Sequence, residues 1–145
     1  MADFQWDCPA SVGVARLDQE HRRLHRLIMG LVRSLERNAR APRGEDRFLE
    51  LFEQTVKHFK TEEDYLEARG YPELAPHRFE HELLLDWFRD QLVLRNTQGA
   101  RPLLLLVQEI AEIIQGHHQT IDRAYALWLE ARPAVSGPGQ APADP

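Results

Sequence analysis

Apolar residues recur at three- and four-residue steps through most of the chain, and this spacing is typical of helices with one buried face. Breaks divide the pattern into four stretches, which predict four helices. The first is expected to begin with Asp18 as its N-cap and to end before a break at residues 38–44. The second is expected to stop at Gly70, since a glycine with Pro72 just beyond it is a common helix end.

The third helix is expected to run from about Glu73 or Pro76 to Arg95, and the fourth from near Pro102 until Pro133. The connections between the stretches are short, so consecutive helices should be antiparallel neighbours. No stretch shows the period of a strand. The sequence therefore predicts an all-α fold, an antiparallel up-down-up-down four-helix bundle.

The two ends of the chain lack this pattern. Residues 1–17 read as an extended N-terminal arm with apolar side chains available to pack on the bundle. Residues 133–145 are rich in Pro, Gly and Ala and read as a disordered tail. We therefore expect one domain over residues 1–132, followed by the tail.

Composition narrows the functional classes. The net charge is -5 and the positive residues are interleaved with negative ones, so we expect neither a nucleic-acid partner nor an anionic membrane surface. No apolar run is long enough for membrane insertion, and no secretory signal is recognisable. Cys8 is the single cysteine, which excludes an intrachain disulfide and favours a reducing, cytoplasmic location. A monomer is favoured.

Polar residues interrupt the apolar stripes at positions that should face the core. They are His21, His58, Glu62, His77, His81 and His117. A buried carboxylate without a partner costs on the order of several kcal/mol, and a bundle has a single interior in which these groups must meet. A metal centre satisfies imidazoles and carboxylates together, so the pattern predicts one.

The types of residue narrow the choice of metal. A set of imidazoles and carboxylates without thiolates suits iron, zinc, copper or manganese. Five histidines with Glu62, and with Asp122 as a further candidate, are too many for one ion. Two metal ions bridged by carboxylates would use all of them, and iron is the metal we favour.

Short motifs follow one another in a fixed order along the chain. They are Val12-Gly13-Val14, Leu17-Asp18, His21-Arg22-Arg23-Leu24, His58-Phe59, Glu62-Glu63, Gly70-Tyr71-Pro72, His77 with His81, and His117 with Ile121-Asp122. Through these motifs the sequence resembles the hemerythrin family, especially its bacterial members, from Trp6 to about Trp128.

The resemblance implies two iron ions, Fe²⁺ or Fe³⁺, joined by a bridging oxo or hydroxo group. One iron would be held by His77, His81 and His117, and the other by His21 and His58 alone. Glu62 and Asp122 would bridge them. The second iron then has an open position, where dioxygen would bind reversibly and be held as hydroperoxide. The implied function is oxygen transport, storage or delivery, not enzyme catalysis.

The same scheme gives a purpose to the apolar residues expected around the site, since they would exclude water and slow autoxidation. They are Leu24, Ile28, Leu51, Phe59, Leu84, Ile114 and Ile121. Relatives usually have glutamine where this chain has Glu20, which is expected to change the hydrogen bonding that orients His21.

The ligand pair in the fourth helix raises a geometric problem. Asp122 follows His117 by five residues, about 140° around an ideal α-helix, whereas His118 is four residues away. The family pattern has the five-residue spacing, so we choose His117 and expect a local π-like widening of the helix. For His118 we expect a second-shell or solvent-facing place, and for His25 a structural or surface one.

Two other functions stay open. One is a di-iron oxidase or peroxidase, although bundle enzymes of the ferritin-like kind use Glu-x-x-His pairs, and no histidine here has a glutamate three residues before it. The other is an oxygen or iron sensor that acts through a partner protein. An oxygen-consuming protein is the expected partner of a carrier.

Overall fold

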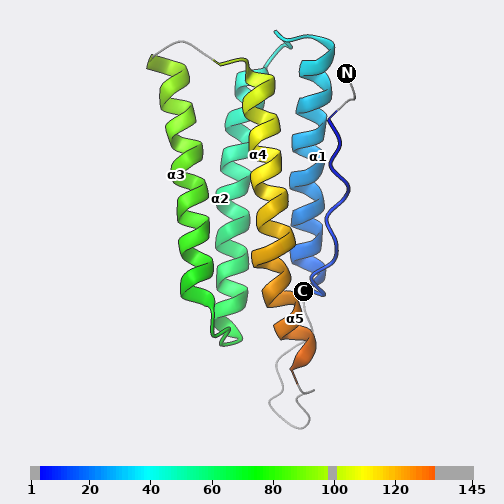
Figure 1. The fold of residues 1–145 in the computed structure, drawn as a ribbon, viewed down its shortest axis with the longest axis vertical. Helices are drawn as coiled ribbons and strands as arrows, with labels where there is room; N and C mark the ends of the chain where they lie inside the picture. The colour runs from blue at the N-terminus through cyan, green and yellow to red at the C-terminus, as the bar shows by residue number, and fades with distance from the viewer. Residues whose placement is uncertain (1–3, 98–100, 133–145) are drawn as a thin grey trace.

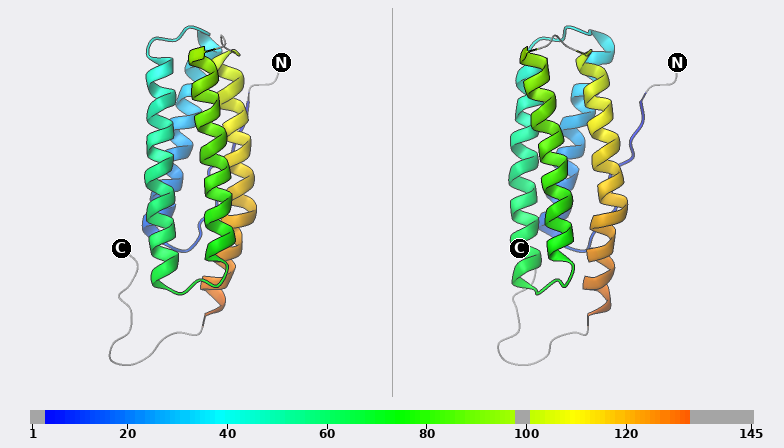
Figure 2. Two further views of the ribbon diagram at one scale, coloured as in Figure 1. Left: turned by 90° about the vertical axis from the view of Figure 1, so that its left-hand side faces the viewer. Right: turned by 60° about the vertical axis from the view of Figure 1, so that its left-hand side comes forward.

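The structure is a computed structural model that describes residues 4–97 and 101–132. Its helical elements are α1 (Ala15–Arg37), α2 (Gly44–Ala68), α3 (Leu74–Thr97), α4 (Leu103–His117), the π-helical segment η1 (His118–Asp122) and α5 (Arg123–Ala131). The last three continue one another as a single rod, so the chain forms four long helical rods that run up, down, up and down (Figures 1 and 2). The predicted all-α four-helix bundle is confirmed.

The start of α1 and the end of α2 can be compared with the predicted helix bounds. Gly70 has a φ of 71°, and the Tyr71 amide bonds to the Leu66 carbonyl at 3.0 Å, which is the glycine-terminated helix end that was predicted. The predicted start at Asp18 is wrong, because α1 begins at Ala15. The Asp18 carboxylate lies in the first turn and accepts hydrogen bonds from outside the helix instead of capping it.

The other bounds differ from the prediction by one or two residues. α3 continues past Arg95 to Thr97, α4 begins after Pro102, and α5 ends at Ala131. The predicted tail at residues 133–145 lies outside the described residues. Among the described residues, no helix is long and apolar enough to cross a membrane.

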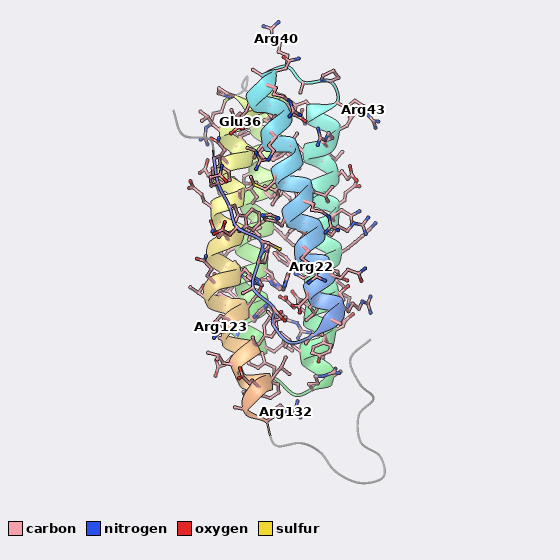
Figure 3. The ribbon with its side chains drawn as sticks, turned by 90° about the vertical axis from the view of Figure 1, so that its right-hand side faces the viewer. Arg22, Glu36, Arg40, Arg43, Arg123 and Arg132 are labelled. Carbon is pink, nitrogen blue, oxygen red and sulfur yellow. The ribbon has the colours of Figure 1, made fainter. Side chains whose placement is uncertain are left out.

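The N-terminal arm runs beside α1 and crosses towards η1 (Figure 3). It ends at Val14 and not at residue 17, because α1 starts earlier than expected. Oδ1 of Asp18 accepts the Val12 amide at 2.8 Å. His25 Nε2 lies 2.7 Å from the Trp6 carbonyl, and a carbonyl only accepts, so this imidazole nitrogen carries a proton. The arm is therefore fastened to the bundle through its own backbone.

The interior consists of two apolar clusters. The larger one extends from Leu24 on α1 towards the loop between α1 and α2, and includes Phe48 and Phe88. The smaller one gathers Leu17, Leu66 and other residues near the turn between α2 and α3. His21 falls between Leu17 and Leu24, so the polar residues of the core separate the two clusters.

Candidate metal centre

All seven side chains that the sequence singled out as metal ligands meet inside the bundle. The carboxylates of Glu62 and Asp122 are 0% and 3% exposed, and the imidazoles are 1–8% exposed. Their elements are α1 for His21, α2 for His58 and Glu62, α3 for His77 and His81, the end of α4 for His117, and η1 for Asp122.

Three of the imidazoles gather around one oxygen of each carboxylate. Oε1 of Glu62 lies 2.8 Å from His77 Nε2 and 3.2 Å from His81 Nε2. Oδ1 of Asp122 lies 3.0 Å from His117 Nε2. We call this end of the site the three-histidine pole, formed by His77, His81 and His117.

The second oxygen of each carboxylate faces the other two imidazoles. Oε2 of Glu62 lies 3.2 Å from His21 Nε2 and 3.5 Å from His58 Nε2. Oδ2 of Asp122 lies 3.4 Å from His21 Nε2. This is the two-histidine pole, formed by His21 and His58. Each carboxylate thus presents one oxygen to each pole, which is the arrangement needed to bridge two ions.

The ring nitrogens show that the residues fit metal ions. His81 Nε2 and His117 Nε2 lie 3.2 Å apart and are both directed at the carboxylates. Without a cation, at least one of these two nitrogens must carry a proton. Three groups of potential ligand atoms are close enough to hold an ion: Glu62, His77, His81, His117 and Asp122 in the first, His21, His58 and Glu62 in the second, and His21, His118 and Asp122 in the third.

Carboxylates on the outer side of the site fix two of the imidazoles. His58 Nδ1 lies 2.8 Å from Oε1 of Glu20, and His81 Nδ1 lies 2.7 Å from Oε1 of Glu63. An Nδ1–H donated to a carboxylate leaves the Nε2 lone pair directed inward, ready for a metal. Glu20 was expected to affect His21, but its carboxylate holds His58. Glu63 was part of the family motif, but the contact between its carboxylate and His81 was not predicted.

The expected widening of the fourth helical rod is confirmed. The Arg123 amide bonds to the His118 carbonyl five residues back, as in a π-helix. Thr120 assists, because its hydroxyl donates to the Gly116 carbonyl at 2.7 Å and competes with the ordinary ladder. The extra residue brings His117 and Asp122 to the same side of the helix.

Comparison with known proteins agrees with this geometry. The family model described as "Hemerythrin HHE cation binding domain" matches residues 12–129. The chain belongs to the hemerythrin family. Membership implies a non-heme di-iron site, and the side chains just described are the ones available to hold it.

Two curated relatives are bacteriohemerythrins. The chain is 33% identical over 85 residues to the one from Stenotrophomonas maltophilia (strain R551-3), a match that covers 59% of the chain and 55% of the relative. It is 32% identical over 82 residues to the one from Clostridium acetobutylicum, covering 54% of the chain and 64% of the relative. The matches therefore span less than two thirds of either relative.

Solved structures of hemerythrin share the fold. The wild-type crystal structure superimposes with a TM-score of 0.74 and 22% identity, covering 90% of this chain and 100% of that one. The structure of a hemerythrin variant with a leucine replaced by tyrosine gives a TM-score of 0.75 at the same identity and coverage. At this identity the likeness establishes the bundle and no more.

His118 occupies the two-histidine pole of this hemerythrin site without belonging to the predicted ligand set. Its Nδ1 lies 3.2 Å from Oδ2 of Asp122 and its Nε2 lies 2.9 Å from the Ala10 carbonyl. The residue is 8% exposed, so the solvent-facing alternative is wrong, and it lies close enough to His21 and Asp122 to form a group of potential ligands with them. His118 therefore links a candidate bridging carboxylate to the N-terminal arm.

Tyr125 was not anticipated from the sequence. Its hydroxyl donates to Oε2 of Glu62 at 2.8 Å, and the residue is fully buried. Phe59 adds an apolar contact to the site, because its ring stacks on His81 with centroids 3.7 Å apart. The signal for Tyr125 was its place one turn after Asp122, but a tyrosine on a buried helix face is usually an ordinary core residue.

The carboxylates and imidazoles of the site stabilise one another's charged forms. Burial would raise the pKa of Glu62, but hydrogen bonds from four histidines hold that pKa well below its usual range. Burial would lower the pKa of His58, but the carboxylates of Glu20, Glu62 and Asp122 raise it to about 10. In the metal-free chain the His58 imidazole thus carries a proton that an entering metal ion must displace.

A small apolar cavity adjoins the two-histidine pole. Its volume is about 20 Å³, and it is lined by both His21 and His58, but by only one imidazole of the three-histidine pole, that of His117. Trp6 and Pro9 of the arm line it. Of the seven apolar residues expected around the site, four also line it: Leu24, Phe59, Leu84 and Ile114.

Proposed function

We propose that this chain binds dioxygen reversibly at a pair of non-heme iron ions and serves as an oxygen carrier, store or delivery protein. The observation that carries the proposal is the cavity beside the two-histidine pole. A cavity of about 20 Å³ exceeds the ~10–15 Å³ that one water needs and is far below the hundreds of Å³ typical of sites for organic ligands. It therefore favours a diatomic ligand.

The assignment of ligands follows from the two poles. His77, His81 and His117 would hold one iron, His21 and His58 the other, and Glu62 and Asp122 would bridge them together with a solvent-derived oxo or hydroxo group. The unequal number of imidazoles leaves room for an added ligand at the two-histidine pole, where the cavity lies. When bound, a diferrous pair supplies two electrons to dioxygen and recovers them on release.

The chain's own residues would protect that chemistry. Leu24, Phe59, Leu84 and Ile114 keep water away from the ligand, which would slow irreversible oxidation. Glu20 and Glu63 orient the two imidazoles that they contact. Tyr125 holds the oxygen of Glu62 that faces the two-histidine pole.

The proposed role is binding and not catalysis. Five imidazoles and two carboxylates give the site less negative charge than a carboxylate-rich centre, so it should stabilise high-valent iron less well. The size of the cavity also disfavours an organic substrate. An oxidase, a peroxidase or a sensor acting through a partner protein stands as the alternative.

We further propose a cytoplasmic monomer that delivers oxygen to an oxygen-consuming protein. The single, exposed Cys8, the acidic net charge of -5 and the proposed chemistry of the site support this proposal.

A cavity-filling variant tests the proposal. Leu24→Phe places extra carbon in the cavity, whereas Leu66→Phe enlarges a buried residue of the smaller apolar cluster. Both changes should cost about 1–3 kcal/mol of stability. We expect both variants to keep two irons per chain, and Leu24→Phe alone to lose oxygen affinity by about tenfold or more, because added bulk excludes the ligand. Equal oxygen affinities in the two variants would refute the role of the cavity.

A further inference from the structure

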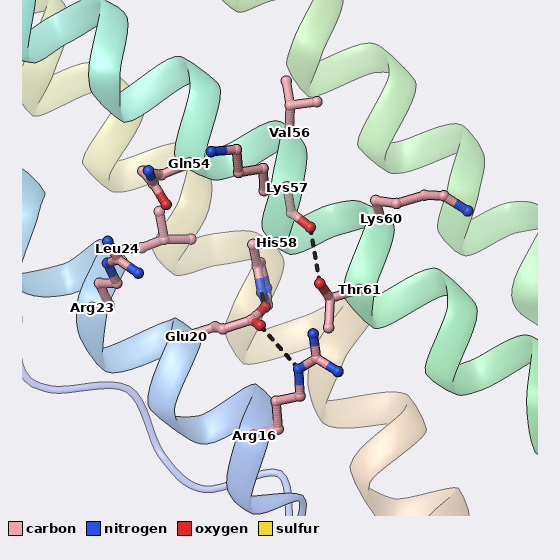
Figure 4. A pocket seen from close by; sticks show the side chains of 10 residues that line it. All are labelled: Arg16, Glu20, Arg23, Leu24, Gln54, Val56, Lys57, His58, Lys60 and Thr61. Carbon is pink, nitrogen blue, oxygen red and sulfur yellow. Dashed lines mark hydrogen bonds and ion pairs between the residues drawn. The ribbon is translucent and has the colours of Figure 1, made fainter. Parts of the chain in front are cut away.

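A groove of about 530 Å³ lies between α1 and α2, on the outer side of the two-histidine pole (Figure 4). Four cations line it: Arg16 and Arg23 from α1, and Lys57 and Lys60 from α2. These two lysines are the only ones in the chain. The sequence suggested that positive charge is dispersed, but the fold gathers it here.

The balance of charge in the groove is positive. Glu20 is the one acidic residue of its lining, and its carboxylate lies 3.5 Å from Arg16 and 2.8 Å from His58. Asp64, beside the groove, pairs with Lys60 at 2.6 Å. Arg23 and Lys57 are exposed, and no ion pair holds either of them in the described part of the chain. Two cations thus remain for a partner.

The groove also leads directly to the metal site. The Glu20 side chain is 26% exposed and its Oε1 contacts His58 Nδ1, while His58 Nε2 lies 3.5 Å from Oε2 of Glu62. One buried imidazole thus spans the distance between the groove and the two-histidine pole.

The corresponding route at the three-histidine pole has the opposite charge. Glu63 contacts His81, and its side chain is 20% exposed. Arg78 forms ion pairs with both Glu63, at 3.4 Å, and Glu67, at 2.8 Å. Two carboxylates and one guanidinium leave that exit acidic. Of these two described routes, the one through Glu20 opens into a positive surface.

The spread of the cations indicates a protein partner. Arg16 and Arg23 are seven residues apart, about 10 Å along the helix, and Lys57 lies on the facing helix. Cations so separated do not converge on one small anion. They suit an extended acidic surface, which they would attract over a distance and orient on contact.

We propose that this groove is the docking surface of an acidic one-electron donor protein, which returns the oxidised iron pair to its ferrous state through Glu20 and His58. The inference rests on the iron pair of the proposed function. Each ferric ion gains one electron, so two molecules of the donor are oxidised for each pair restored. An iron–sulfur protein with an acidic face has the required chemistry.

The test uses a reduced, acidic [2Fe–2S] ferredoxin as the probe and the oxidised, iron-loaded protein, without oxygen. The double variant R23Q/K57Q removes two charges from the groove. R89Q/R101Q removes two from side chains that are 54% exposed elsewhere. We expect R23Q/K57Q to lower the second-order rate constant of reduction about tenfold at low ionic strength, and the effect to fade at high salt. R89Q/R101Q should match the wild type.

Binding of oxidised ferredoxin to the oxidised protein, followed by calorimetry, involves no electron transfer and no oxygen. It should weaken in R23Q/K57Q alone, while oxygen binding of the chemically reduced variant should be unchanged. A failure of reversible oxygen binding in every form would therefore refute the proposed function and not the docking surface. Equal reduction rates in both double variants would refute the docking surface. The docking surface would also be refuted if R23Q/K57Q lost binding to vesicles of anionic phospholipid while its rate of reduction stayed unchanged. That result would indicate that the groove contacts a membrane.

Discussion

The hydroxyl of Tyr125 donates to Oε2 of Glu62 at 2.8 Å in the fully buried interior. Glu62 provides the only carboxylate that contacts four of the five candidate imidazoles in the described residues. Burial, together with the charges of Glu62 and Asp122, raises the pKa of Tyr125 well above its usual value, so the hydroxyl keeps its proton. Tyr125 thus fixes the carboxylate on which both poles depend.

Replacement of this tyrosine tests that role. Tyr125→Phe removes one hydrogen bond to a charged group, so we expect a loss of about 1.5–3 kcal/mol in the free energy of unfolding. The pair of irons should still form, with affinity weakened by about 10–100-fold, as is usual for partners of metal ligands. Denaturation and iron titration measure the two quantities. Unchanged iron affinity would show that Tyr125 serves packing alone.

The ligand assignment separates histidines that lie within a few ångströms of one another. We expect His77→Ala and Glu62→Ala to abolish stoichiometric iron pairing, since each removes donor atoms from the site. His118→Ala and His25→Ala should leave two irons per chain, because these side chains contact Asp122 and the arm. Metal analysis of each variant, with helix content as the control for folding, decides the matter. If His118→Ala lost the metal while His117→Ala kept it, the assignment in the fourth rod would be wrong.

The seven candidate ligands were recognisable from sequence because each interrupts an apolar stripe or matches a family motif. Even the π-helical turn could be expected, since the five-residue separation of His117 and Asp122 does not fit an α-helix. Such features follow from the spacing of apolar and polar residues along each helix, which is a local property of the sequence.

The contacts on the outer side of the site were harder to predict from the sequence. Glu20 is separated from His58 by 38 residues and Glu63 from His81 by 18, and an acidic residue on a helix usually faces solvent. Their partners depend on the rotation of neighbouring helices, which no single stretch of sequence specifies. The role of Asp18 was misjudged for a related reason. An aspartate near a helix start can either cap the helix or accept hydrogen bonds from the segment that precedes it, and the sequence does not distinguish these roles.

The corrected role of Asp18 has its own consequence. Asp18→Ala removes the acceptor for the Val12 amide and for the Ser11 hydroxyl, which lies 2.5 Å away. We expect hydrogen exchange at Val12 to accelerate by at least about tenfold, because a native amide bond is lost, while amides in the middle of α1 stay protected. A capping role would instead expose the first turn of the helix. Exchange followed residue by residue by NMR distinguishes the two.

The stability of the metal-free protein should depend on pH. The pKa of His58 is raised to about 10 in the folded chain, from an unfolded value near 6.5. Its proton therefore stabilises the fold fully below about pH 6.5, and this stabilisation is lost as pH rises through about 10. We expect the denaturation midpoint of the metal-free protein to fall between pH 7 and 10. The iron-loaded protein should lack that decline, since its imidazoles bind metal and not protons. Parallel declines in both forms would contradict this explanation.

We propose that the two poles hold an iron pair that binds dioxygen reversibly. The most direct measurement is a visible absorption spectrum of the iron-loaded protein, first reduced without oxygen, then exposed to air and then purged, with iron counted per chain. We expect two irons and a charge-transfer band that appears with oxygen and disappears on purging. Two irons that oxidise once and do not return would contradict reversible binding, and the absence of paired iron would contradict the metal centre itself.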